Sequence, residues 1–496
     1  MRDVMIRRLV ILVLGALVVL VSAAEAVEEA AGDEALEGLP QDEWQAVFMK
    51  GKRIGYLHMK MQREGDFIVS DVKMKMTMQR FGSETTVQMG SKYREHLDGT
   101  PVAFVTETKT GAMKIRTKGT TRDGKLHLVT TVGEMSQERT VEWDPEALFP
   151  YALDRKLRSL KLEPGEEFTV QVFSPEISTS EPVEMTIKVI GPDEVNVLGV
   201  KHEAIKIETR VSKMPSLVEH SWLDAQGNVL AAEVAQMGGI RMVRCTKAYA
   251  LAGPEAVDLG DLMLIKPDTP LKAVDELSRL VVKLSTVDGS PFSVELPSEG
   301  HQRAVERDET SVTLEISDAL TKTEEKDLGP FRSASTLLNS DDERIVAAAK
   351  KAVGNETDAW RKAQALRRAV YELVDEKSYD VAMASASEVI RNKEGDCTEH
   401  AVLLAAMARA AGIPSRVAIG LMYVQGRFGY HMWTQVYVDG AWRDVDAVLD
   451  GRDFDPAHIR LATSPMSDDE FLFDLAAFVS VFGNLKIEII EAERAD

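Results

Sequence analysis

Apolar and polar residues alternate along most of the chain from Glu43 to about Ala250. A period of two is typical of β-strands that bury one face, and it runs through segments such as DFIVSDVKMKMTMQR, EEFTVQVF and HEAIKIETRV. Asp98-Gly99 and Asp123-Gly124 mark tight turns between strands. One interruption, DPEALFPYALDRKLRSLKL, looks partly helical. We expect a β-rich N-terminal domain over residues 27–255, built as a wide, curved antiparallel sheet or half-barrel.

The alternation ends in AGPEAVDLGDLMLIKPDTP, where Gly, Pro and Asp cluster as they do in linkers. The following segment predicts a small β linking domain over residues 256–335. Its expected strands are SVTLEIS and a hairpin, RLVVKLSTVDGSPFSVEL, that turns at Asp288-Gly289.

Apolar residues take up a helical spacing from about Asp341 onward. DERIVAAAKKAV predicts a first helix, and DAWRKAQALRRAVYELVDEK predicts a second whose apolar stripe faces a core. The stripe consists of Trp360, Ala363, Leu366, Val370 and Leu373. Strands follow, and FLFDLAAFVSVF and an alternating LKIEII close the chain. The pattern predicts a C-terminal α+β domain over residues 336–496, so the whole chain is expected to be multidomain.

The N-terminal 26 residues have the three parts of a secretory signal peptide. MRDVMIRR is basic, LVILVLGALVVLV carries no charge, and Ala24 and Ala26 form a small-x-small cleavage pattern. We expect residues 1–26 to be a signal peptide and the mature protein to be soluble, in the periplasm or secreted. The alternative is an uncleaved membrane anchor, because the apolar run is close to the lower length limit for a span. Residues 27–40 read as a flexible acidic leader.

Composition narrows the classes of function. With 44% hydrophobic and 28% charged residues the chain has the composition of an ordinary globular protein, and 496 residues are too many for one core. The formal net charge of -21 argues against binding to nucleic acid or anionic lipid, which calls for clustered Lys and Arg.

Cys245 and Cys397 are the two cysteines of the chain. An oxidising compartment favours disulfides, but no framework of spaced cysteines surrounds either residue, which argues against a bridge between them. Cys397 lies in GDCTEHA, where Asp396 is the expected N-cap of a helix and Glu399 completes a capping box. That helix should stop at Gly412. A first-turn cysteine faces the positive end of the helix dipole, so we expect an exposed thiol whose pKa lies below its free value.

A second motif, GYHMWTQVYVDGAWRDVDAV, supplies a base for this thiol. Asp439-Gly440 predicts a two-residue hairpin loop, which sets the register of the two strands around it. Gln435 then faces Asp444, and Asp446 becomes the diagonal neighbour of His431, within side-chain reach. The hairpin therefore predicts that His431 and Asp446 pair, with Cys397 supplied by the helix.

Other interpretations of nearby residues stay open at this point. Cys397 and His400 form a Cys-x-x-His half-site for zinc, but no second ligand pair accompanies it, so His400 is expected to support the site by packing or hydrogen bonding. Asp444 is expected on a solvated face or behind the site. Trp433 could line a cleft or fill the core. For His431 the alternative is a packed side chain, because a lone histidine on a strand is more often packed than catalytic.

GDCTEHAVLLAAMARAAGIPSRVAIGL followed by GYHMWTQVYVDGAWRDVDAV resembles the transglutaminase-like superfamily in its bacterial form, from about residue 340 to 465. In that family a Gly-x-Cys motif opens a helix, His-x-Trp begins a strand, and an Asp ends the next strand. These positions correspond to Cys397, His431 and Asp446. AVLD after Asp446 departs from the Pro-Thr of many members. The resemblance implies a papain-like α+β domain that follows the mainly antiparallel N-terminal β domains.

The resemblance also implies a thiol mechanism. Cys397 would attack an amide carbonyl, His431 would hold the thiolate as an ion pair, and Asp446 would orient the imidazole. The expected function is a periplasmic or secreted cysteine peptidase, amidase or acyltransferase that acts on peptide or isopeptide bonds through a thioester. A protein or peptide is the expected partner, and no cofactor or metal is expected. The alternatives are a non-catalytic transglutaminase-like binding module, and a carrier whose N-terminal β domain holds an apolar ligand.

Overall fold

The computed structural model describes residues 39, 41–80, 83–110, 113–133, 135–292, 294–374, 384–468 and 476–495. The predicted signal peptide, residues 1–26, lies outside the described residues. The described chain forms two compact units, which we call the N-terminal unit, ending at Leu259, and the C-terminal unit, beginning at Gly260. A search of the described residues for helices long and apolar enough to cross a membrane finds none.

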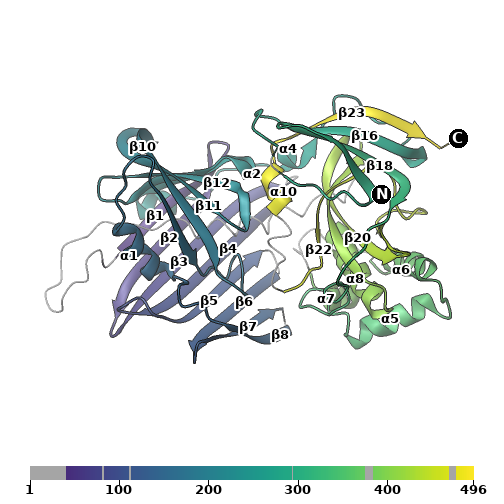
Figure 1. Ribbon diagram of the computed structural model, residues 1–496, viewed down its shortest axis with the longest axis horizontal. Coiled ribbons are helices and arrows are strands. Elements are labelled where there is room, and N and C mark those ends of the chain that lie inside the picture. Colours follow the sequence, from purple (N-terminus) through teal and green to yellow (C-terminus); the bar gives the residue numbers. More distant parts are fainter. Residues whose placement is uncertain are drawn as a thin grey trace. The chain divides into compact units, whose positions relative to one another are not determined.

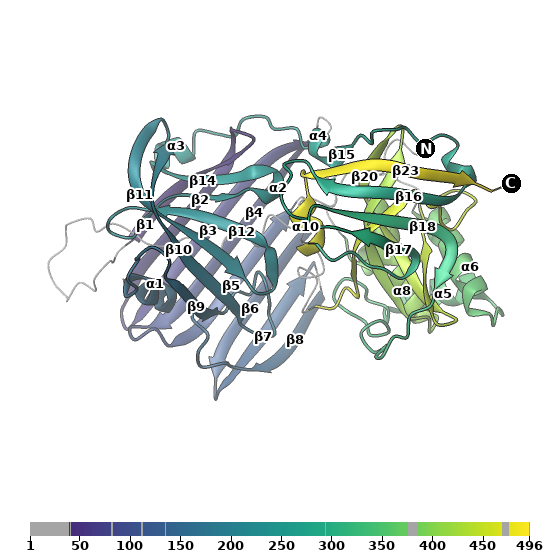
Figure 2. The same cartoon turned by 45° about the horizontal axis from the view of Figure 1, so that its top comes forward.

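The N-terminal unit is built on one 14-stranded sheet whose strands follow the order β8-β7-β6-β5-β4-β3-β2-β1-β14-β13-β12-β11-β10-β9. Neighbouring strands pair antiparallel, as the alternating sequence predicts. Figures 1 and 2 show β10 to β12 passing in front of β2 to β4, so the sheet curves back over itself. The elements are β1 (Gln41–Met49), β2 (Lys52–Glu64), β3 (Phe67–Arg80), β4 (Ser83–His96), β5 (Pro101–Thr110), β6 (Met113–Arg122), β7 (Lys125–Val132), β8 (Met135–Glu142), α1 (Pro150–Arg158), β9 (Glu167–Val172), β10 (Val183–Val197), β11 (Val200–Val211), β12 (Met214–Leu223), β13 (Val229–Val234), α2 (Gln236–Gly239), β14 (Ile240–Cys245) and α3 (Lys247–Ala250).

Helix α1 forms in the interrupted segment and packs on the inner face of this sheet. Its Tyr151 and Ala152 N–H groups donate to the carboxylate of Glu95 on β4, at 2.8 and 2.9 Å. These N–H groups have no partner within the helix, so a buried carboxylate at the helix start satisfies both. Burial raises the pKa of Glu95 to about 8, although the two backbone hydrogen bonds lower it.

The C-terminal unit contains a five-stranded sheet in the order β15-β20-β19-β22, with β21 paired to β20. Helix α8 packs against β19 and β20 and is also contacted by α5, α6 and α7, which explains why its residues are buried almost all round. The elements are α4 (Gly260–Met263), β15 (Leu264–Ile265), α5 (Glu343–Val353), α6 (Ala359–Leu373), α7 (Ala386–Asn392), α8 (Cys397–Ala410), β19 (Ser415–Val424), β20 (Arg427–Val438), β21 (Ala441–Val445), β22 (His458–Ser464) and α10 (Ala476–Val481).

A four-stranded sheet in the order β17-β18-β16-β23 completes this unit. Its elements are η3 (Val274–Glu276), β16 (Leu277–Thr286), β17 (Gly300–Arg307), β18 (Ser311–Thr321) and β23 (Leu485–Arg494). The predicted hairpin at Asp288-Gly289 is wrong, because β16 pairs with β18 and with β23 from the end of the chain. None of the described residues between Gly289 and Gly300 lies in a strand. Long-range pairing thus takes the place of the local turn that the Asp-Gly pair suggested.

The predicted fold class is confirmed. A large antiparallel sheet comes first, and helices with a smaller sheet follow in the C-terminal part. The division into four segments at residues 26, 255 and 335 stays a prediction.

Glu219 on β12 makes the stability of the N-terminal unit depend on pH. Its carboxyl is 1% exposed and accepts one hydrogen bond from Ser221, and burial raises its pKa from 4.5 to about 8. The native state therefore keeps a proton that the unfolded chain releases between these values, so stability falls as pH rises from 4.5 to 8. Glu219→Gln should lose this dependence. One pKa unit corresponds to about 1.4 kcal/mol, so the variant should gain on the order of a few kcal/mol relative to the parent over this range.

Thermal unfolding of the parent and of Glu219→Gln at several pH values measures how the difference in their stability changes with pH. The exposed Glu194→Gln change provides a control that removes an equal charge. A Glu219→Gln curve parallel to that of the parent would contradict the assignment.

Candidate active site

Cys397 is the first residue of α8, and the sequence accounts for that position. Asp396 is the N-cap and accepts the N–H of Thr398 at 3.0 Å, while the Asp396 N–H donates to Glu399 at 2.9 Å. The predicted capping box is confirmed. His400 lies one turn along, is 4% exposed, and pairs through Nδ1 with the carbonyl of Asp396 at 2.6 Å. His400 thus holds the start of α8, as the sequence predicts.

The environment of the Cys397 thiol differs from the prediction. The residue is 1% exposed, and burial raises the pKa of its thiol well above 9.0. Asp396 and, to a smaller extent, Glu399 and Asp446 raise it further, whereas a hydrogen bond from the Met432 backbone lowers it. The expectation of an exposed thiol with a lowered pKa is therefore wrong, because loss of water and nearby carboxylates outweigh the helix dipole.

The hairpin of β20 and β21 has the predicted register. Gln435 lies opposite Asp444, and the loop residues Asp439 and Gly440 both have positive φ values, 56° and 77°, as its two-residue turn requires. Strand β21 ends at Val445, so Asp446 follows it directly. The expected pairing in the hairpin is confirmed.

His431 and Asp446 meet in the core of this unit. His431 Nε2 lies 2.8 Å from Asp446 Oδ2, and the two side chains are 0% and 1% exposed. The other ring nitrogen, Nδ1, has no hydrogen-bond partner among the described residues. The ring is thus fixed at one nitrogen and uncommitted at the other, which suits a base that takes a proton from a neighbour.

Cys397 approaches this pair because α8 packs on β20. The hydroxyl of Thr434 donates to the carbonyl of Ala401 on α8 at 2.9 Å. The backbone of Met432, the residue after His431, hydrogen-bonds the Cys397 sulfur. The Cys397 thiol therefore lies beside the strand that carries His431, and the charge of Asp446 acts on it. The two cysteines of the chain are both free, and Cys245 belongs to the N-terminal unit.

A second histidine, His458 on β22, shares the Asp446 carboxylate. His458 Nε2 lies 3.2 Å from Asp446 Oδ2, and its Nδ1 lies 3.0 Å from Asp455 Oδ1. Burial alone would lower the pKa of His458, but Asp455 and Asp446 together raise it to about 10. Burial would likewise raise the pKa of Asp446, but His431 and His458 hold it well below its usual range. Asp446 therefore stays ionised between two imidazoles.

Asp444 forms another buried hub, behind the histidine. Its carboxylate accepts hydrogen bonds from Trp433 Nε1 at 2.6 Å and from Gln435 at 2.8 Å. His301 Nδ1, from β17, lies 2.8 Å away, and Arg460 lies within 3.3 Å. The expectation of a solvated Asp444 is wrong, because His301 from β17 and Arg460 from β22 surround its carboxylate and bury it. Asp444 has the other expected role, which is to support the site from behind.

Trp433 lies between Asp444 and His431 and contacts both. The two rings stack with their centroids 6.0 Å apart and their planes 16° apart. Gly420 on β19 makes room for the indole, because a Cβ there would lie 2.9 Å from the Trp433 ring and 2.0 Å from the carbonyl of Ile459. Trp433 is buried, so it fills core and orients the imidazole.

His431, Asp446 and His458 each offer one nitrogen or oxygen atom, and these three atoms lie within 4.8 Å of one another, a spacing that also suits a metal ion. A metal ligand must present an unprotonated nitrogen. His458 carries a proton at neutral pH, since its pKa is raised to about 10, and both of its nitrogens face carboxylates. The three residues therefore fit a charged hydrogen-bond network better than a metal centre.

The sequence interpretation missed His301, Asp455, His458 and Arg460. His458 and Arg460 do carry a weak signal, because they alternate on one face of HIRLATS. Nothing local shows that β22 lies beside β19, which is what places them at the site.

Comparison with known proteins finds a family match over the part of the chain that contains Cys397 and His431. A family model described as the transglutaminase-like superfamily matches residues 346–447. No curated protein matches the chain.

Among solved structures, a candidate cysteine protease from Cytophaga hutchinsonii has 17% identity and a TM-score of 0.30, over 44% of this chain and 88% of its own. A β-barrel-like protein of a domain family of unknown function from Brucella abortus has 12% identity and a TM-score of 0.31, over 41% of this chain and 96% of its own. These scores are too low to support an argument about fold or function.

Replacing His458 tests the charge network around Asp446. His458→Gln removes a buried positive charge and leaves two buried carboxylates, so it should destabilise the C-terminal unit by about 3–5 kcal/mol at neutral pH. The raised pKa of His458 contributes stability that is present in full below 6.5 and is lost as pH rises to about 10. The difference between parent and variant in urea unfolding should therefore shrink at alkaline pH.

Arg303→Ala serves as the control, since it breaks an ion pair in the same unit whose arginine is 58% exposed. An exposed pair of this kind contributes about 0–1 kcal/mol. If His458→Gln and Arg303→Ala lost the same free energy of unfolding, a buried charge network at His458 would be ruled out.

Proposed function

Because residues 346–447 are transglutaminase-like, we propose that this protein is a thiol enzyme that acts on peptide or isopeptide amide bonds. The observation that carries the proposal is the buried pair of His431 and Asp446, which belongs to the hairpin against which α8 packs. Cys397 is the first residue of α8, so the start of this helix is the proposed source of the nucleophile. Cys397 is the nucleophile, His431 the general base and acid, and Asp446 the group that orients His431.

The proposed reaction begins with a neutral thiol. The pKa of Cys397 is raised by burial, so a preformed thiolate and imidazolium pair does not fit the resting site. His431 takes the thiol proton as the sulfur attacks the amide carbonyl, and the carbonyl oxygen becomes an oxyanion. His431 then gives that proton to the leaving amine, the C–N bond breaks, and an acyl thioester remains on Cys397.

Water or a second amine resolves the thioester. His431 removes a proton from the attacking group, the C–S bond breaks, and the proton returns to the sulfur. The product is a carboxylic acid or a new amide, so hydrolysis and acyl transfer differ only in the second nucleophile. We favour hydrolysis, because water needs no binding site of its own.

The backbone N–H of Cys397 is the proposed oxyanion donor. The side chain of Asp396 accepts the N–H groups of Thr398 and Glu399, but no hydrogen bond from the Cys397 N–H is found within the described chain. A free N–H at a helix start points at the carbonyl that its own side chain attacks. We further propose that the enzyme works in the periplasm or outside the cell on a protein or peptide substrate, as the N-terminal sequence indicates.

Substitution of Cys397 and of Asp446 should separate their roles in turnover of amide substrates. Cys397→Ala should abolish activity, and Asp446→Asn should lower kcat by at least about 100-fold, because the imidazole loses its orienting carboxylate. Cys245→Ala is the matched thiol control and should keep parental activity. Activity that survives Cys397→Ala would remove the thiol from the mechanism, whereas a parent chain without activity on any amide substrate would favour a binding module.

The rate of Cys397 alkylation by iodoacetamide should depend steeply on pH. Because the pKa of the buried thiol is raised above 9.0, the rate should climb by about tenfold per pH unit from pH 6 to 9. Mass spectrometry can follow Cys397 in the Cys245→Ala chain. A constant rate over this range would mean that the thiolate is already formed at rest, contrary to the proposed neutral thiol.

A further inference from the structure

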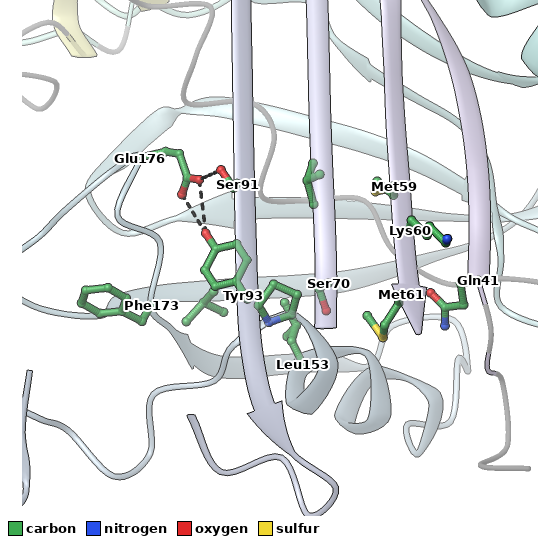
Figure 3. A pocket seen from close by; sticks show the side chains of 13 residues that line it. Gln41, Met59, Lys60, Met61, Ser70, Ser91, Tyr93, Leu153, Phe173 and Glu176 are labelled. Atoms are coloured by element: carbon green, nitrogen blue, oxygen red, sulfur yellow. Dashed lines mark hydrogen bonds between the residues drawn. The ribbon is translucent and has the colours of Figure 1, made fainter. Parts of the chain in front are cut away.

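The inner face of the N-terminal unit holds a cavity that the thiol chemistry does not use. Strand register places Tyr93, Ser70, Met61 and Gln41 in one row across β4, β3, β2 and β1. The floor of the cavity is formed by this row and the next one, and α1 and the end of β9 close its side. Figure 3 shows side chains of these strands directed into the space above α1. The cavity itself measures about 50 Å³, and the space reaches about 650 Å³ only when the open solvent at its mouth is counted, so a ligand with an apolar body extends into that mouth.

Most of the cavity wall is apolar. Met59, Met61, Leu153, Val172 and Phe173 contribute to it, and each of them is almost fully buried. Such a wall suits an aliphatic or aromatic body rather than a sugar or a nucleotide.

Glu176 supplies the strongest polar group of the lining. Its carboxylate accepts hydrogen bonds from Ser91, from Tyr93 at 3.1 Å and from Ser174 at 3.0 Å. Burial and Glu176 itself raise the pKa of Tyr93, so the phenol keeps its proton and donates. Three neutral hydroxyl groups hold the carboxylate in place without neutralising it. No ion pair links Glu176 to a lysine or arginine within the described residues.

Lys60 also lines the cavity but does not neutralise Glu176. Figure 3 shows its side chain at the opposite end of the cavity, directed away from Glu176. A half-buried carboxylate without a cation therefore faces an apolar space. This combination attracts a positively charged group attached to an apolar body.

Ser70 gives an independent sign that the cavity receives a polar ligand. It is 2% exposed, and its hydroxyl has no hydrogen-bond partner among the described residues. Figure 3 shows Ser70 between Tyr93 and Met61, in the middle of the floor. Buried hydroxyl groups are nearly always satisfied, so an atom outside the chain is expected to meet this one.

We propose that this cavity binds an amphipathic primary amine. The ammonium group donates to Glu176, the aliphatic or aromatic body lies between the methionines and α1, and Ser70 offers a second polar contact. Anionic amphiphiles are excluded by the same carboxylate. Neutral amphiphiles lose the charge-assisted hydrogen bond and bind more weakly. The site does not depend on the proposed reaction at Cys397, so either proposal can fail alone.

Three ligands with one chain length and different head groups test the charge requirement on the full-length protein. Octylamine should bind in calorimetry at least about 10-fold more tightly than octan-1-ol, and octanoate should not bind. Ethylamine, which has the charge without the apolar body, should also fail to bind. Equal affinities for octylamine and octanol would overturn the proposal, as would tighter binding of octanoate. This comparison uses the unsubstituted chain, so it does not depend on the folding of a variant.

Substitutions then locate the site. Glu176→Gln should weaken octylamine binding by about 10-fold or more and leave octanol binding unchanged. Glu194→Gln removes the same charge from the exposed side of the unit, so it controls for attraction of a cation to an acidic protein. An equal effect of both variants would overturn the assignment to Glu176.

Ser70→Ala separates a ligand contact from a bound water molecule. It should weaken octylamine binding by about 2- to 10-fold, because a neutral hydrogen bond is lost. Thermal unfolding without ligand should show no loss of stability, since the hydroxyl has no partner in the free protein. A destabilised Ser70→Ala chain with unchanged affinity would mean that only water or the protein itself satisfies Ser70, and it would remove this second contact.

Discussion

The buried carboxylate of Asp446 is the group on which the candidate active site depends. It lies 2.8 Å from His431 and 3.2 Å from His458, and all three side chains are almost completely excluded from water. A carboxylate in such a place is stable only if cations or hydrogen-bond donors compensate it, and each imidazole needs the carboxylate in turn. Three features therefore depend on one another. They are the orientation of His431, the charge of His458 and the packing of β22 beside β19.

The packing of α8 on β20 sets the position of the Cys397 thiol relative to this carboxylate. The capping box sets where the helix begins, and the contact from Thr434 to Ala401 sets its height along the strand. In this position the Cys397 thiol is buried away from water, and its pKa is raised as a result. The raised pKa favours a neutral thiol, which is where the site departs from the ion pair that the family resemblance implies.

Features that depend on neighbours in sequence could be predicted. The capping box at Asp396, the turn at Asp439-Gly440 and the register that follows from it each involve residues a few positions apart. Features that depend on distant pairing could not. The Asp-Gly pair at 288–289 resembles the one at 439–440, yet β16 finds its partners in β18 and in β23 near the end of the chain. His458 lies at Asp446, and His301 at Asp444, only because β22 and β17 pack beside these strands. The burial of Cys397 arises from the packing of α8 against β19, β20 and the helices α5, α6 and α7.

The proposed function requires Cys397 to carry the acyl group of a reaction intermediate. Intact-protein and peptide mass spectrometry of the chain mixed with p-nitrophenyl acetate tests it most directly, because the acetyl group is small enough for a buried thiol. The account predicts one acetyl group on Cys397 that hydroxylamine removes, with no such adduct in Cys397→Ala and much slower formation in His431→Ala. Acetylation that spares Cys397, or that proceeds equally without His431, would contradict the account.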